Sequence, residues 1–116
     1  AGAGEIGEAA AAAALSRSLF VAVARDASSN PIGTGRVIGD GVCFCQLVDV
    51  FVKPGHEEAA DAIVSALLDY ADREAPAEAD VIVMTDLAGI GVYQRHGFKL
   101  VYPDRYGMSR KRGDGG

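Results

Sequence analysis

The sequence contains no tryptophan, only two cysteines and no long run of apolar residues. Cys43 and Cys45 alone cannot build the disulfide framework of a small secreted domain. A membrane-spanning helix needs roughly 18 to 20 consecutive apolar residues, and no stretch approaches that length. Basic residues are also in the minority, since the formal net charge is −5, and this argues against a nucleic-acid binder. We therefore expect a soluble chain with no membrane partner and no nucleic-acid partner.

What is present is typical of a folded domain. The chain has 116 residues, of which 49% are hydrophobic and 23% charged, enough for one core and too few for two. We expect a single domain over residues 1–116, with residues 1–4 and 113–116 frayed at its ends. The alanine-rich start is interrupted by Glu5 and Glu8 and lacks the basic region of a signal peptide, which favours a cytoplasmic location.

The first half of the chain predicts one helix followed by three strands, at residues 5–18, 19–25, 32–39 and 42–52. Turns at Asn30-Pro31 and Gly39-Asp40-Gly41 separate the strands. Strict alternation divides the third strand into two largely apolar faces, which indicates a central strand covered on both sides. One face carries Val42, Phe44, Val48, Val50 and Val52, and the other carries Cys43, Cys45, Leu47, Asp49 and Phe51.

The second half predicts an amphipathic helix over residues 57–74 with a buried stripe of Ala59, Ile63, Ala66, Leu67 and Tyr70. A buried strand (81–84), a short helix capped by Thr85 or Asp86 (88–96) and two final strands (98–102 and 106–110) follow. Short turns make the first three strands antiparallel, and the strand–helix–strand unit requires a parallel, right-handed crossover. The predicted fold class is therefore α/β with a mixed sheet: an antiparallel meander, a β-α-β unit, a short helix and a C-terminal β-hairpin.

Three passages resemble the GNAT N-acetyltransferases, which move an acetyl group from acetyl-CoA to an amine. They are Gly33-Thr34-Gly35-Arg36-Val37-Ile38-Gly39-Asp40-Gly41, Val48-Asp49-Val50-Phe51-Val52-Lys53-Pro54-Gly55-His56 and Val92-Tyr93-Gln94-Arg95-His96-Gly97-Phe98. The last is similar to the family's Tyr-x-x-x-Gly-Phe ending. The resemblance spans roughly residues 17–112 and implies the GNAT fold, with acetyl-CoA as co-substrate.

The resemblance also implies a set of site residues. Backbone groups of Val50, Phe51 and Val52 would bind the pantetheine arm and polarise the acetyl carbonyl, as an oxyanion hole does. The pyrophosphate would lie on the N-terminus of the next helix, where free N–H groups favour an anion. That cofactor-binding segment comprises Glu57, Glu58, Ala59, Ala60, Asp61 and Ala62.

Two side chains are candidate catalytic residues. The resemblance implies that Tyr93 protonates the departing thiolate, and the alternative is a tyrosine that only packs the short helix on the sheet. Asp49 is unusual in an apolar strand and could accept the proton of the amine or bind an ammonium group. The alternative for Asp49 is a bond to Arg36 or to backbone at a bulge. His56 and His96 are further potential bases, and no metal site is expected because the cysteines lack partner ligands.

These features predict an acyltransferase that acetylates a primary amine of a small molecule by direct attack in a ternary complex. The segment His56-Glu57-Glu58-Ala59-Ala60-Asp61-Ala62 departs from the family pattern, because it has no glycine and brings two acids to the phosphate position. The alternative is therefore a catalytically inactive GNAT-like domain for binding or assembly. A more distant alternative is an unrelated small α+β ligand-binding domain. The family's first strand is also missing, and a bare sheet edge favours a homodimer.

Overall fold

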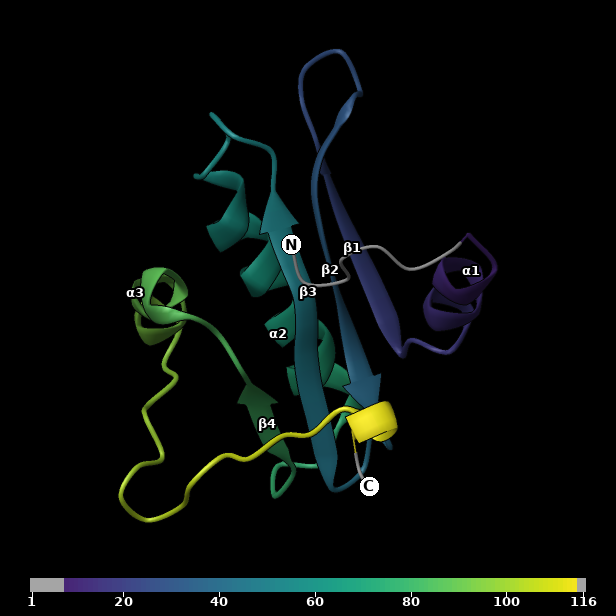
Figure 1. Ribbon diagram of the computed structural model, residues 1–116. Helices are drawn as coiled ribbons and strands as arrows, with labels where there is room; N and C mark the ends of the chain where they lie inside the picture. Colours follow the sequence, from purple (N-terminus) through teal and green to yellow (C-terminus); the bar gives the residue numbers. More distant parts are fainter. Residues whose placement is uncertain (1–7, 115–116) are drawn as a thin grey trace.

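The computed structural model describes residues 8–114 (Figure 1). Its elements are α1 (Glu8–Ser16), β1 (Phe20–Arg25), β2 (Pro31–Gly39), β3 (Phe44–Val52), α2 (Ala59–Glu74), β4 (Asp80–Val83), η1 (Leu87–Gly89), α3 (Ile90–Arg95) and η2 (Arg112–Asp114). The helix expected over residues 5–18 is present as α1, and its first three expected residues lie outside the described part. None of the described helices is long and apolar enough to cross a membrane.

The four strands form one mixed sheet in the order β1-β2-β3-β4. β1, β2 and β3 pair antiparallel, whereas β4 pairs parallel with β3. The connection from β3 to β4 is α2, which lies behind the sheet in Figure 1. The predicted meander and β-α-β unit are confirmed. Among the described residues, β1 is an edge strand of the sheet.

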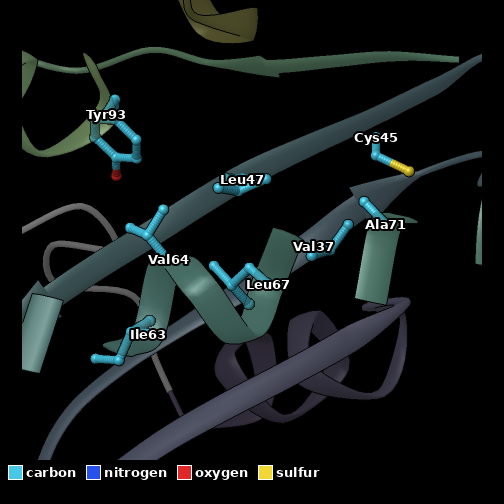
Figure 2. Close-up of a cluster of buried hydrophobic side chains, with 8 residues drawn as sticks. All are labelled: Val37, Cys45, Leu47, Ile63, Val64, Leu67, Ala71 and Tyr93. Carbon is cyan, nitrogen blue, oxygen red and sulfur yellow. The ribbon is translucent and has the colours of Figure 1, made fainter. Parts of the chain in front are cut away.

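The core lies between the sheet and α2. Side chains from β2, β3, α2 and α3 meet in one buried cluster, shown in Figure 2: Val37, Cys45, Leu47, Ile63, Val64, Leu67, Ala71 and Tyr93. The predicted stripe of α2 is confirmed at Ala59, Ile63 and Leu67. Tyr70 is only half-buried, and its ring stacks on Phe20 with centroids 5.0 Å apart.

A β-bulge interrupts β3. Thr34 pairs with Phe51 and Arg36 pairs with Val48, so Asp49 and Val50 together lie opposite Gly35. The extra residue reverses the alternation of side chains beyond it. Leu47 and Val50 consequently pack on the same core, although strict alternation assigns them to different faces.

The predicted division of the third strand into two faces is therefore wrong beyond Val48. The expectation that other elements cover both faces of this strand is also wrong for the described residues. α2 packs on one face, whereas Phe44 and Phe51 are exposed by 50% and 46%. Of the two cysteines, which sequence patterning placed together in the core, Cys45 is buried and Cys43 is exposed before β3 begins.

The C-terminal β-hairpin expected over residues 98–102 and 106–110 is not formed. After α3 the described chain follows turns and irregular backbone up to Lys111, and β4 is an edge strand. Strand-like composition does not make a strand without a partner to pair with. Here the Arg105 N–H donates to the Val101 carbonyl at 2.9 Å, and the rings of Tyr102 and Tyr106 meet edge to face. Residues 98–101 and 105–108 line a pocket together with β4, but within the described part of the chain they form no ladder with it.

Two glycines of β2 allow α2 to approach the sheet closely. A Cβ on Gly33 would lie 2.8 Å from Ile63 Cδ1, and one on Gly35 would lie 2.8 Å from Ile63 Cγ2. Real Cβ atoms do not come this close to their neighbours, because interiors are already packed to crystal density. The contact between α2 and the sheet therefore requires glycine at these positions.

We predict that Gly35→Ala lowers the free energy of unfolding by about 1–3 kcal/mol, because the added methyl must displace Ile63 or Val50. Urea denaturation followed by circular dichroism measures this loss. Gly107→Ala is the matched control, since its Cβ would meet nothing within 4 Å. Equal loss in both variants would contradict the close approach of α2.

Candidate active-site cleft

The parallel pair of strands separates part of the way along β3. The ladder runs from Phe44 opposite Asp80 to Leu47 opposite Val83, where β4 ends. β3 continues to Val52, while the chain after β4 turns away towards α3 (Figure 1). Within residues 8–114, the backbone of β3 from residue 48 onward therefore has no strand beside it on the β4 side.

A cleft of about 530 Å³ occupies this opening. One wall is the end of β3, and the other is formed by the residues after β4 together with α3. The lining residues are Leu47, Val48, Asp49, Val50, Phe51, Val52, Ala60, Met84, Thr85, Asp86, Gly89, Val92 and Tyr93. Carboxyl ends of parallel strands are where open α/β sheets commonly bind ligands, which makes this the candidate active site.

Asp49 lies at the bulge with a left-handed φ of 54°. Arg36 Nε donates to Asp49 Oδ2 at 2.9 Å, and Nη2 lies 2.8 Å from the same oxygen. Arg36 also donates through Nη1 to Ser18 Oγ at 3.0 Å and to the Ala14 carbonyl at 3.3 Å. The alternative to a catalytic Asp49 was a bond to Arg36 or to backbone at a bulge. The structure contains both the Arg36 bond and the bulge. Asp49 nevertheless lines the cleft, so a second role there stays a prediction.

Tyr93 comes from the middle of α3 and belongs to both the core and the cleft. Its ring meets Phe98 edge to face with centroids 5.6 Å apart, and only 8% of the residue is exposed. Within the described residues its hydroxyl makes no hydrogen bond, yet no unpaired side-chain oxygen there is sealed from solvent. The hydroxyl therefore keeps some access to solvent. Burial, and secondarily the charge of Asp86, raises the pKa of Tyr93 and keeps the phenol protonated.

The loop before α2 already uses several of its amide hydrogens. The Gly55 N–H donates to Glu57 Oε2 at 3.0 Å, and the N–H groups of Ala59 and Ala60 donate to the carbonyls of His56 and Glu57. The Gly55 N–H, followed by the backbone N–H of Glu57 itself, holds the pKa of Glu57 below its ordinary value. A carboxylate of this chain therefore occupies an N–H donor of the loop just before the segment that the family resemblance assigns to phosphate.

The residues predicted to bind the cofactor are placed in two groups. Val50, Phe51, Val52 and Ala60 line the cleft together with the two candidate catalytic residues, Asp49 and Tyr93. The others lie outside its lining. Glu57 and Glu58 are exposed in the turn before α2, Ala59 is buried in the core, Ala62 is exposed, and Asp61 bonds to α3.

Sequence reasoning assigned no site role to the residues directly after β4, which form part of the opposite wall. Met84, Thr85, Asp86 and Gly89 follow β4, and Asp86 caps η1 by accepting the Gly89 N–H on Oδ1 at 3.0 Å. The available signal was their position just after a strand predicted to be parallel, since such strand ends meet at the ligand-binding edge. No three metal-ligating side chains come together within residues 8–114.

Several solved structures resemble this chain. A Staphylococcus aureus protein of unknown function, described as a probable acetyltransferase, is 29% identical with a TM-score of 0.83, over 91% of this chain and 80% of that one. A GNAT-family protein from Xanthomonas campestris is 26% identical with a TM-score of 0.72, over 91% and 72% of the two chains. A GNAT-family acetyltransferase from Streptococcus pneumoniae, at 24% identity, has a TM-score of 0.75 over 90% and 80%. No family model matches the sequence, and no curated protein does.

These likenesses show that the chain has the GNAT fold, and they confirm the predicted α/β class with its mixed sheet. The resemblance drawn from the three sequence passages is confirmed as well, because the similar solved structures are GNAT-type proteins.

We predict that Asp49→Val is more destabilising than Asp49→Asn by about 1–2 kcal/mol. Both variants lose the negative charge opposite Arg36, but only asparagine tolerates the left-handed backbone at this position. Chemical denaturation of the two variants measures the difference in the free energy of unfolding. Identical stability of the two would show that the bulge is not held in this conformation.

Proposed function

We propose that this protein is an acetyl-CoA-dependent N-acetyltransferase acting on a primary amine of a small molecule. The observation that carries the proposal is the cleft where β3 and β4 separate, which brings Asp49, the end of β3 and Tyr93 together. Similarity to GNAT-type structures supports the same reaction class. Acetyl-CoA would supply the acetyl group as an activated thioester.

The end of β3 supports binding of an extended arm. No strand of the described chain lies beside residues 48–52 on the β4 side, so their backbone groups are available to a ligand that lies there as a strand would. Val50, Phe51 and Val52 lie along this wall. A backbone N–H from this stretch, directed at the thioester oxygen, would stabilise the charge that develops when the amine attacks.

The two candidate catalytic side chains suit the two proton transfers. Attack by the amine forms the new C–N bond, and cleavage of the C–S bond leaves a thiolate. Tyr93 would donate its phenolic proton to that sulfur, because its raised pKa keeps the proton in place up to alkaline pH. Asp49, directly or through water, would take the proton that the amine loses. Arg36 binds Oδ2, which leaves Oδ1 of Asp49 for this role.

The charge of the cleft supports an amine as the acceptor. Among residues 8–114, the charged side chains that line it are Asp86 and Asp49, whose charge Arg36 partly balances from outside the lining, and no described lysine, arginine or histidine lines it. A cleft with acidic lining concentrates cations near the reacting groups. An ammonium-bearing small molecule is therefore the substrate class we propose.

A specific observation favours a second candidate, a GNAT-like domain that binds or assembles without catalysis. The loop before α2 has its Gly55 N–H engaged by Glu57, and it carries a second exposed acid at Glu58. Both charges oppose a pyrophosphate there. The edge of the sheet at β1 would then serve for pairing with a second copy of the chain.

We predict that acetyl-CoA raises the melting temperature of the purified protein by several degrees. A ligand at about 100 times its dissociation constant stabilises the folded state by about 2.7 kcal/mol. Differential scanning fluorimetry measures the shift, and titration calorimetry gives the dissociation constant. The Glu57→Ala variant frees the Gly55 N–H and should bind more tightly. Absence of a shift at millimolar acetyl-CoA would favour the non-catalytic domain.

We predict that Tyr93→Phe lowers kcat by about 10²-fold or more, while the dissociation constant for acetyl-CoA changes little. The substitution removes only the hydroxyl and keeps the ring that packs on Phe98. Steady-state assays of thiol release with a panel of small primary amines measure kcat. Tyr102→Phe is the control, because Tyr102 is exposed and lies outside the cleft. Full turnover by Tyr93→Phe would remove Tyr93 from the mechanism.

A further inference from the structure

The helix that carries Tyr93 is weak by itself. α3 has six residues, and glycines stand at position 91 within it and at position 89 just before it. Glycine costs roughly 1 kcal/mol relative to alanine inside a helix, and so short a helix is not stable alone. Contacts with the rest of the molecule must therefore fix the position of α3, and with it the position of the Tyr93 hydroxyl.

Asp61 makes such a contact from the first turn of α2. Arg95 Nη2 donates to Asp61 Oδ2 at 2.9 Å, and His96 Nε2 lies 2.9 Å from Asp61 Oδ1. A carboxylate can only accept, so Nε2 of His96 carries the hydrogen in this bond. Arg95 and His96 are the last residue and the C-cap of α3. One aspartate thus holds two successive residues at the end of the Tyr93 helix.

The contact has the geometry of a strong one, despite partial exposure. Side-chain exposure is 42% for Asp61, 58% for Arg95 and 20% for His96. Hydrogen bonds from Arg95 and then His96 hold the pKa of Asp61 below its ordinary value, so the carboxylate is ionised at neutral pH. Charge-assisted bonds from two donors fix direction as well as distance. The Asp61–Arg95 pair alone would be a surface ion pair that contributes little to stability. His96 is half-buried, so its bond to Asp61 is better shielded from solvent and anchors the contact.

We propose that Asp61 is a positioning residue, which through Arg95 and His96 clamps α3 to α2 and sets where the Tyr93 hydroxyl lies in the cleft. The role in catalysis rests on the proposed function, whereas the clamp itself does not. Asp61 lies outside the cleft lining, so it would act on the reaction only through α3.

The experiment follows the ionisation of Tyr93 by ultraviolet difference absorbance at 295 nm in the full chain. Subtracting the titration of the matching Tyr93→Phe protein isolates this one tyrosine. Asp61→Asn removes the charge and one of the two acceptor oxygens of the clamp, and His96→Phe removes its half-buried donor without changing the first turn of α2. Asp69→Asn is the matched control, because it removes an exposed acid from the same helix.

We expect the pKa of Tyr93 to fall towards its ordinary value in Asp61→Asn and in His96→Phe, because a released α3 exposes the ring. The Tyr93 pKa should fall no further in the double variant than in either single variant, because the two residues belong to one interaction. In Asp69→Asn the Tyr93 pKa should equal that of the unchanged protein. An unchanged Tyr93 titration in both clamp variants would overturn the proposal. If Asp61→Asn does not fold, His96→Phe decides alone.

Activity provides a second, separable measurement. With a working transferase, Asp61→Asn should lower kcat by about tenfold or more and leave the KM for acetyl-CoA nearly unchanged, since a small misplacement of a reacting group is costly. Asp61→Glu should recover part of kcat. If the parent protein transfers no acetyl group but the Tyr93 titration still shifts, the proposed function fails and the clamp stands. A raised KM with unchanged kcat would overturn the positioning role.

Discussion

The cleft depends on the extra residue at the bulge in β3. A regular strand would place Leu47, Asp49 and Phe51 on one face, which would bury the Asp49 carboxylate under α2. An ionised group in that position would be very unfavourable without a partner. The bulge instead places Val50 and Val52 on the core, and the Asp49 carboxylate accepts a hydrogen bond from Arg36. The bulge lies where β3 continues past the end of β4. One inserted residue therefore affects both the packing of β3 on the core and the opening of the cleft between β3 and β4.

Arg36 and the glycines of β2 complete this arrangement from the neighbouring strand. Arg36 joins the bulge to the end of α1 through Ser18 and the Ala14 carbonyl. On the other face, Gly35 lies opposite the bulge and leaves room for Ile63. Because α2 lies so close to the sheet, its first turn comes to the cleft at Ala60 and to α3 at Asp61. The spacing of helix and sheet therefore determines which residues can meet at the site.

Sequence periodicity predicted the sheet, the crossover and α2, because these depend on long apolar patterns that single residues do not disturb. It missed the bulge, since valines at positions 48, 50 and 52 make an interrupted strand look regular. It also predicted a C-terminal hairpin from strand-like residues, although a hairpin needs a partner edge as well as composition. In the site, the family motifs brought Asp49, the end of β3 and Tyr93 to one cleft. The Asp61 contact spans more than thirty residues of sequence and had no local signal.

The charges near the cleft bear on how a coenzyme A thioester would be recognised under the proposed function. The donors of the loop before α2 are partly engaged by Glu57, and Glu58 adds a second negative charge near the phosphate position. Phosphate contacts at that loop would therefore be weaker than in a glycine-rich cradle. Binding would then depend more on the end of β3, where an extended arm can bond to backbone, and on the cleft beside Tyr93. Recognition of this kind is concentrated at the reacting end of the molecule, where the position of α3 would act on proton transfer through Tyr93.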